Sequence, residues 1–331
     1  MNKKIILGIL ISVVLVYLSV RGINLQDVLN DLKKIQLNYV ILFILLMIFM
    51  QYLRSYRWGV ILQPMEKIDQ VPLFSITSVG FLAIAAIPAR IGELARPYLI
   101  SKRSSIKMSS ALGTIFIERI LDSFTVLTIA TVVLLMDMPF DLPSWMVKSS
   151  IIFSLFALSL FCFILFLILR REAALKFINI ILNKLPGKLA NKIDVAIHHF
   201  IDGLQIVTNI KLFSYLLFLS VVIWLVDVLA IYVLLLAFGF TLPVMASFVL
   251  MVILIVGIAI PAAPGFVGNW HYACVFALGL FGLAKADALS FAVVHNFLSM
   301  AIVLVLGVGF LPFNRFSIAE MKKQMNNDKE N

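Results

Sequence analysis

Charged and helix-breaking residues interrupt an apolar stretch of the chain between positions 87 and 97. The interrupting residues are Pro88, Arg90, Gly92, Glu93 and Arg96. An ionised side chain at membrane depth costs at least about 2.5–3.5 kcal/mol, so such charges usually mark a functional site. Proline cannot donate a backbone hydrogen bond and glycine tolerates an open backbone, which together predict a broken helix. Free N–H groups at the start of a helix favour anions, so the segment is predicted to bind an anion.

A second group of charges follows in the next long apolar run, at Glu118, Arg119 and Asp122. Glu118 and Asp122 are four residues apart and share one helix face, while Arg119 is placed to pair with Asp122. The two carboxylates need cations, which Arg90 or Arg96 could supply. The group fits a ligand site, and it equally fits an internal ion-pair cluster that only holds helices together.

Arg54 and Arg57 precede Trp58 near the end of an earlier apolar run. With them, the polar set contains five arginines against three acids. The arginine fork binds phosphate oxygens bidentately, so this excess of arginine favours a phosphate-bearing ligand. The alternative for Arg54 and Arg57 is an interfacial anchor, whose charged ends reach the membrane surface.

A second interrupted segment lies near the C-terminal end, where Pro264, Gly265 and Gly268 follow an apolar run. The spacing of Pro264 and Gly268 repeats that of Pro88 and Gly92, and Ile-Pro-Ala begins both segments. Paired interrupted helices in two halves of a chain indicate a transporter binding site and an inverted repeat.

Neutral polar residues, rather than charges, accompany this second segment. They are Asn269, His271, His295 and Asn296. Asn269 and His271 are predicted to contact substrate, whereas His295 is expected to be an ordinary polar residue between helices. Asp227 is a further lone acid in an apolar run, able to carry a proton or to partner a histidine.

The composition requires a membrane protein. The 331 residues are 62% hydrophobic and 13% charged, with a net charge of +10 and a mean hydropathy of +1.07. Soluble domains are about 45–50% apolar and about 25% charged. The two cysteines, Cys162 and Cys274, supply neither a disulfide framework nor a metal-binding cluster.

Apolar runs near the roughly 20 residues that cross a bilayer predict seven to nine membrane segments. They are 5–20, 38–60, 109–135, 147–169, 212–237, 244–260 and 286–311, with 73–89 and 264–283 interrupted and either spanning or re-entrant. The predicted fold is an all-α polytopic transmembrane bundle with two broken or re-entrant helices. It forms one domain over 1–311, including a cytoplasmic amphipathic segment at 172–209, followed by a polar cytoplasmic tail over 312–331.

The distribution of lysine and arginine predicts the orientation of the chain. Loops 97–108 and 170–211 and the C-terminal tail are basic, whereas 136–146 and 238–243 contain no basic residue. Basic loops stay on the cytoplasmic side. Both termini are therefore expected to be cytoplasmic, in the cytoplasmic membrane of a bacterium or archaeon, although the basic residues of 21–37 oppose this assignment.

The four motifs together resemble the lysylphosphatidylglycerol synthase transmembrane region, a flippase-like integral membrane family. The matching residues are Arg54-x-x-Arg57-Trp58, Pro88-x-Arg90-x-Gly92-Glu93-x-x-Arg96, Glu118-Arg119-x-x-Asp122 and Pro264-Gly265-x-x-Gly268. The resemblance covers about residues 5 to 311. It implies a helical bundle with re-entrant elements that moves an anionic lipid or lipid-linked intermediate between leaflets.

Two departures narrow what the resemblance implies. Bifunctional members carry a soluble aminoacyl-transferring domain, whereas only the short segment 312–331 follows here, so lipid aminoacylation is not expected. The family commonly has an acid shortly after the C-terminal glycine motif, where this chain has His271.

The predicted function is translocation of an anionic phospholipid or polyprenyl-phosphate-linked lipid across the membrane. Arg90, Arg96 and Arg119 would bind the phosphate, and Glu93, Glu118 and Asp122 would orient those arginines. Two alternatives stay open. One is an intramembrane enzyme that uses Glu118 or Asp122 as a base on a lipid phosphate. The other is a non-catalytic subunit for envelope-lipid assembly.

No catalytic residue, metal site or cofactor is predicted, and no Walker sequence for ATP hydrolysis occurs. The expected partners are an anionic lipid and the membrane, not nucleic acid. Homodimerisation and association with envelope-lipid biosynthesis enzymes are left open.

Overall fold

The computed structural model describes residues 14–22, 25–86, 92–136, 151–152, 155, 159, 210–259 and 263–314. Every regular element within these ranges is helical, and they contain no strand. The predicted all-α class is therefore confirmed. The predicted segment 172–209, and most of the predicted span 147–169, lie outside the described residues.

The helices follow one pattern twice: a long helix, a pair of shorter helices, and a second long helix. After the short α2 (Leu25–Lys33), the first set is α3 (Leu37–Leu62), α4 (Gln70–Ala86), α5 (Ala95–Ser101) and α6 (Met108–Leu135). The second set is α10 (Ile210–Ala237), α11 (Val244–Ala259), α12 (Asn269–Gly279) and α13 (Lys285–Asn314), with a 3-10 turn, η3 (Pro264–Phe266), between α11 and α12.

The helices are apolar on their outer as well as their inner sides. Large hydrophobic side chains such as Phe49, Leu229 and Phe297 are 48%, 47% and 67% exposed. A helix with no polar face is suited to lipid rather than water. By length and composition, α3, α10 from Lys211 onward, and α13 could each cross a membrane, and α4 and α11 are shorter apolar helices.

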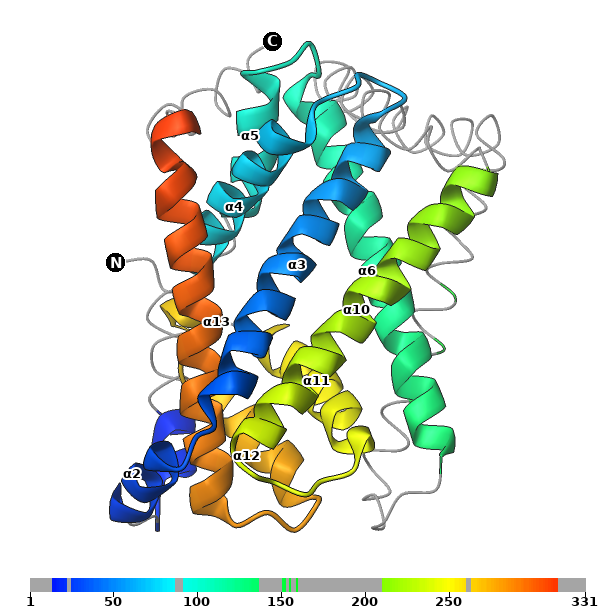
Figure 1. The fold of residues 1–331 in the computed structure, drawn as a ribbon. Helices are drawn as coiled ribbons and strands as arrows, with labels where there is room; N and C mark the ends of the chain where they lie inside the picture. Colours follow the sequence, from blue (N-terminus) through cyan, green and yellow to red (C-terminus); the bar gives the residue numbers. More distant parts are fainter. Residues whose placement is uncertain are drawn as a thin grey trace, which may run out of the picture.

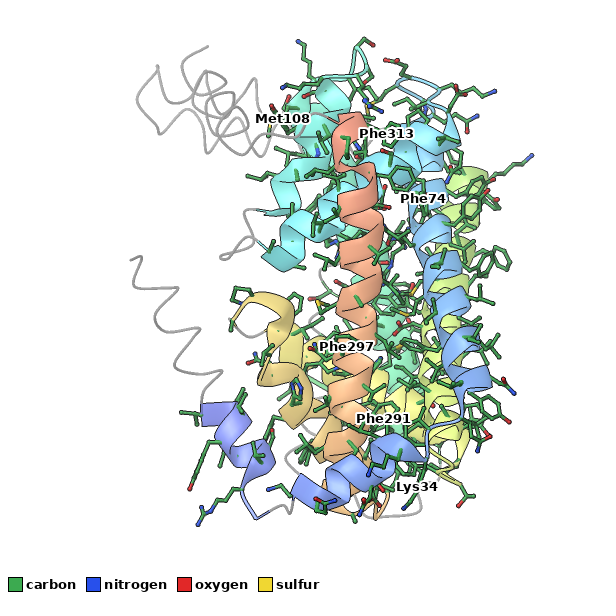
Figure 2. The ribbon with its side chains drawn as sticks, turned by 60° about the vertical axis from the view of Figure 1, so that its left-hand side comes forward. Lys34, Phe74, Met108, Phe291, Phe297 and Phe313 are labelled. Carbon is green, nitrogen blue, oxygen red and sulfur yellow. The ribbon has the colours of Figure 1, made fainter. Side chains whose placement is uncertain are left out.

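The two sets run in opposite directions, which makes them an inverted repeat. In Figure 1, α3 rises from the lower end of the bundle and α6 descends, whereas α10 descends and α13 rises. The α4–α5 pair occupies the upper half and the α11–α12 pair the lower half. Figure 2 shows the same arrangement, with Phe313 at the end that holds Met108, and Phe291 at the end that holds Lys34.

The paired short helices are re-entrant hairpins. The 11 residues of α12 span about 16 Å at 1.5 Å per residue, too short for a hydrocarbon core of about 30 Å. α12 packs against α11, and α5 packs against α4. η3, at the tip of the second hairpin, contacts α4 of the first, so the two hairpins meet inside the bundle.

The predicted break at the second hairpin is confirmed by its backbone. Gly265 and Gly268 have φ angles of 71° and 92°, and Phe266 has a φ of 58°. A left-handed backbone favours glycine, and these residues lie in the non-helical connection between the end of α11 at Ala259 and the start of α12 at Asn269. At the first hairpin, α4 ends at Ala86 and a short 3-10 turn at 92–94 leads into α5, while Pro88 and Arg90 lie outside the described residues.

Contacts between the repeats hold the bundle together. α3 packs along α10, α4 along α13, and α6 against α11. Gly307 of α13 permits a close approach to α4, because a Cβ atom there would lie 2.4 Å from the Cβ of Leu82. α13 continues to Asn314, beyond the predicted end of its apolar run at 311, and the Asn314 amide donates a 2.6 Å hydrogen bond to Ser75 Oγ in α4.

Candidate functional site

A buried ionic cluster joins α3, α6 and α10 in the upper half of the bundle. The Arg57 guanidinium donates through Nη1 to Asp122 Oδ1 at 2.7 Å and to Ser220 Oγ at 2.7 Å. Its Nη2 lies 3.8 Å from Glu118 Oε1. The Arg57 and Glu118 side chains are only 2% and 1% exposed. Arg57 is thus a buried ion-pair partner and not the interfacial anchor that was the alternative.

Arg96 enters the same cluster from α5. Its Nη1 donates to Glu118 Oε2 at 2.6 Å, and its guanidinium carbon lies 4.2 Å from the centroid of the Trp58 ring. Trp58 is fixed in turn, because its indole N–H donates to Thr114 Oγ1 at 3.0 Å. Gly80 makes room for the arginine, since a Cβ atom there would lie 2.2 Å from Arg96 Cγ. The Arg96 guanidinium therefore has a defined plane and one defined partner.

Donors on both buried arginines lack acceptors within the described part of the chain. They are Nε and Nη2 of Arg96 and Nε of Arg57. A buried donor without an acceptor costs roughly 1–3 kcal/mol. Nε and Nη2 form one edge of the guanidinium fork, the edge that binds two oxygens of a phosphate or carboxylate in parallel. Arg96 thus uses Nη1 for Glu118 and keeps an intact bidentate edge.

Two further arginines lie at the margin of the cluster. Arg119 is half-exposed, and its Nη2 lies 3.6 Å from Asp122 Oδ2, as its spacing predicted. The half-buried Arg54 lies over the Phe81 ring, with 5.1 Å between guanidinium carbon and ring centroid. Its charge interacts with those of Asp227 and Asp122. In the described part of the chain, the ion pairs of the cluster join three arginines, Arg57, Arg96 and Arg119, to two carboxylates, Glu118 and Asp122, which leaves the ion-paired group positive.

The re-entry into α5 also depends on a glycine. A Cβ atom on Gly92 would lie 2.2 Å from the backbone oxygen of Ala83, so only glycine allows the turn to pack against α4. Glu93 follows it, half-buried, three residues before Arg96. Arg90, which was predicted to bind phosphate, is not among the described residues.

The predicted residues of the second half lie apart from the ionic cluster. Asn269 is 2% exposed, and its amide donates to the Gly257 carbonyl at 2.9 Å, which ties α12 to α11. Asn296 of α13 likewise donates to the Gly265 carbonyl at 3.0 Å, which holds the hairpin tip. His271 is half-buried on α12. Asn269 and His271 thus both lie on α12 of the second hairpin, and the polar side chains named here are neutral.

Sequence reasoning missed three parts of the cluster. Ser220, Thr114 and Gly80 sit in ordinary apolar runs, and their roles depend on partners far away in the chain. The sequence feature that came nearest was the pair of carboxylates, Glu118 and Asp122, on one helix face. This pair indicated that cations must lie nearby, but it did not identify Arg57 as one of them. No group of three or more His, Cys, Asp or Glu residues that could hold a metal occurs in the described ranges.

Comparison with known proteins supports the family assignment. The family model of the lysylphosphatidylglycerol synthase transmembrane region matches residues 5–307. A UPF0104 membrane protein of Methanothermobacter thermautotrophicus (strain Delta H) is 25% identical over 97% of this chain and 98% of its own length. A UPF0104 membrane protein of Methanocaldococcus jannaschii is 25% identical over 72% of this chain and 97% of its own length. No solved structure matches.

The family match covers nearly all of the chain. The apolar helices of the chain form a bundle around buried charges. This chain is an integral membrane protein of the lysylphosphatidylglycerol synthase transmembrane-region family.

Proposed function

We propose that the protein moves an anionic lipid between the two leaflets of its membrane and binds the lipid phosphate at Arg96 and Arg57. The observation that carries this proposal is that the Nε–Nη2 edge of Arg96 and the Nε of Arg57 lack acceptors among the described residues, although both arginines are buried in the same cluster. A phosphate group supplies acceptor oxygens for these donors, and its charge matches the positive cluster. Arginine suits such planar, bidentate recognition better than lysine does.

The surroundings of the cluster favour a lipid over a soluble anion. Arg57 and Glu118 are almost completely buried between helices whose outer surfaces are apolar. A ligand that approaches through the bilayer must carry its own hydrocarbon, and the ligand classes that fit are phospholipids and polyprenyl-phosphate-linked lipids.

The inverted repeat favours transport as the outcome of binding. In many secondary transporters, substrate sites lie between inverted repeats and beside discontinuous helices. Here the two re-entrant hairpins belong to opposite repeats and meet through η3 and α4. A small rocking of one repeat against the other would expose the cluster alternately to either side.

The enzyme alternative is less well supported, because both candidate bases are already engaged. Each carboxylate oxygen of Glu118 and Asp122 faces an arginine, at 3.8 and 2.6 Å for Glu118 and at 2.7 and 3.6 Å for Asp122. A general base needs a lone pair directed at the substrate. These ion pairs instead support a role for both carboxylates in orienting the arginines.

Reconstitution into liposomes tests the proposal. Labelled phosphatidylglycerol is followed for exchange between leaflets and for chemical change, with labelled phosphatidylcholine for comparison. We expect the wild-type protein to exchange phosphatidylglycerol without altering it, and Arg96→Gln to abolish exchange. Arg21→Gln, at an exposed arginine outside the cluster, should exchange normally. A chemically altered lipid would support the enzyme alternative. If the lipid is neither exchanged nor altered, the result would support the assembly-subunit alternative.

A further inference from the structure

The inverted repeat gives the ionic cluster a counterpart in the second half of the chain. Glu118, Arg119 and Asp122 lie ten, eleven and fourteen residues after Met108, the first residue of α6. The corresponding positions of α13, counted from Lys285, hold the set His295, Asn296 and Ser299. Both helices pack against the second helix of their own hairpin, α5 for α6 and α12 for α13.

This counterpart is buried but uncharged. His295 and Ser299 are 4% and 3% exposed. They lie four residues apart, so their side chains share one face of α13. His295 Nδ1, Ser299 Oγ and the indole N–H of Trp270 lack hydrogen-bond partners within the described residues. Unsatisfied polar atoms at this depth are costly, which indicates that something outside these residues hydrogen-bonds with them.

Aromatic rings surround His295. The ring of Trp270, on α12, meets it edge-on with centroids 5.0 Å apart. Phe291 lies 5.3 Å from it and Phe43 lies 5.8 Å from it. None of these neighbours carries a charge, so a charged ligand would find no counter-ion among them. A neutral ligand with hydroxyl groups fits, because hydroxyls both donate and accept and the C–H faces of a polyol can lie against aromatic rings.

We infer that His295, Ser299 and Trp270 form a second binding site, which takes the hydroxylated, uncharged part of a lipid headgroup, such as a sugar or a glycerol. The inference rests on the proposed function for its claim that the ligand is a lipid. It refines the substrate class to lipids that carry hydroxyl groups as well as phosphate. His295 is then a ligand-binding residue and not the ordinary interhelical residue that its isolation in the sequence suggested.

Native mass spectrometry of the intact protein, released from phosphatidylcholine nanodiscs doped with one probe lipid, tests this site. Monoglucosyl diacylglycerol offers hydroxyls without phosphate, and phosphatidic acid offers phosphate without a polyol. We expect the wild-type protein to retain both over phosphatidylcholine. The double variant His295→Phe, Ser299→Ala should retain the glucolipid at least about fivefold less, the effect of losing one typical hydrogen bond, with phosphatidic acid retention unchanged.

Ser299→Ala alone removes one oxygen atom, and it replaces the double variant in this experiment if the double variant does not fold. It should weaken glucolipid retention in the same direction. The inference is overturned if the glucolipid is retained no better than phosphatidylcholine, or if the folded variants retain it as the wild type does, because ordered water then satisfies these atoms. Arg96→Gln separates the two proposals: it should reduce phosphatidic acid retention only, and unchanged retention would refute the phosphate site while leaving this one standing.

Discussion

Replacing Arg96 by lysine separates the structural role of this residue from its binding role. Lysine keeps the positive charge that Glu118 requires at 2.6 Å, so the buried ion pair survives. It has no second nitrogen along its side chain, so the edge formed by Nε and Nη2, which lacks acceptors within the described residues, disappears. We therefore expect Arg96→Lys to insert and fold but to bind lipid phosphate poorly.

The magnitude follows from the hydrogen bonds that are lost. A hydrogen bond to a charged group contributes roughly 1.5–3 kcal/mol. If lysine replaces two such bonds with one, affinity for a phosphate lipid falls roughly 10- to 150-fold. By contrast, removing one partner of a buried ion pair destabilises a protein by about 3–5 kcal/mol, so Arg96→Gln should also lower the unfolding temperature.

The assay combines retention of phosphatidic acid, leaflet exchange of labelled phosphatidylglycerol and thermal unfolding in nanodiscs. Arg103→Lys is the matched control, because Arg103 is an exposed arginine in the loop after α5 whose guanidinium donates to the Phe313 carbonyl. Wild-type binding and exchange by a folded Arg96→Lys protein would refute the role assigned to the guanidinium edge.

Three further variants test other parts of the structure. Gly92→Ala should lower the unfolding temperature, because its Cβ atom would lie 2.2 Å from the backbone oxygen of Ala83; an unchanged unfolding temperature would show that the turn can adjust. Glu93→Gln should abolish leaflet exchange while the protein still inserts, and normal exchange would remove Glu93 from the site. Hydrogen bonds from Ser105 lower the pKa of Glu66, so the stability that they contribute is fully present above the ordinary carboxyl pKa and is lost as pH falls through the lowered pKa. Glu66→Gln should therefore flatten the acid side of a plot of unfolding temperature against pH. A plot identical to that of the wild type would contradict this prediction.

For the part of the chain that the structure describes, the sequence was sufficient for the all-helical fold and for the break before α12. Long apolar runs must be helical in a membrane, because only an internally hydrogen-bonded backbone is stable there. The pattern of Pro264 and Gly268 located the second re-entry because proline and glycine act through their own backbone, without a distant partner. Local chemistry of this kind is visible in a single sequence.

The pairing of charges could not be predicted in the same way. Arg57 lies beside Trp58 near the end of α3, a position equally suited to an interfacial anchor. Burial and contact with Asp122, 65 positions away, and with Ser220, 163 positions away, decide its role. Such contacts depend on how α3, α6 and α10 cross, which composition and spacing do not specify.

The two repeats keep one geometry and differ in charge. Arg54 and Asp227 each lie seventeen residues after the first residue of their helices, α3 and α10, and their charges interact. They therefore occupy corresponding positions in the two repeats. In the first repeat, the α5–α6 interface holds Arg96 against Glu118, and in the second, the α12–α13 interface holds Trp270 against His295. A headgroup that moved from the first proposed site to the second would exchange a charged environment for a neutral one. The two proposed sites together would therefore suit a lipid with both phosphate and hydroxyl groups better than one with a bare phosphate.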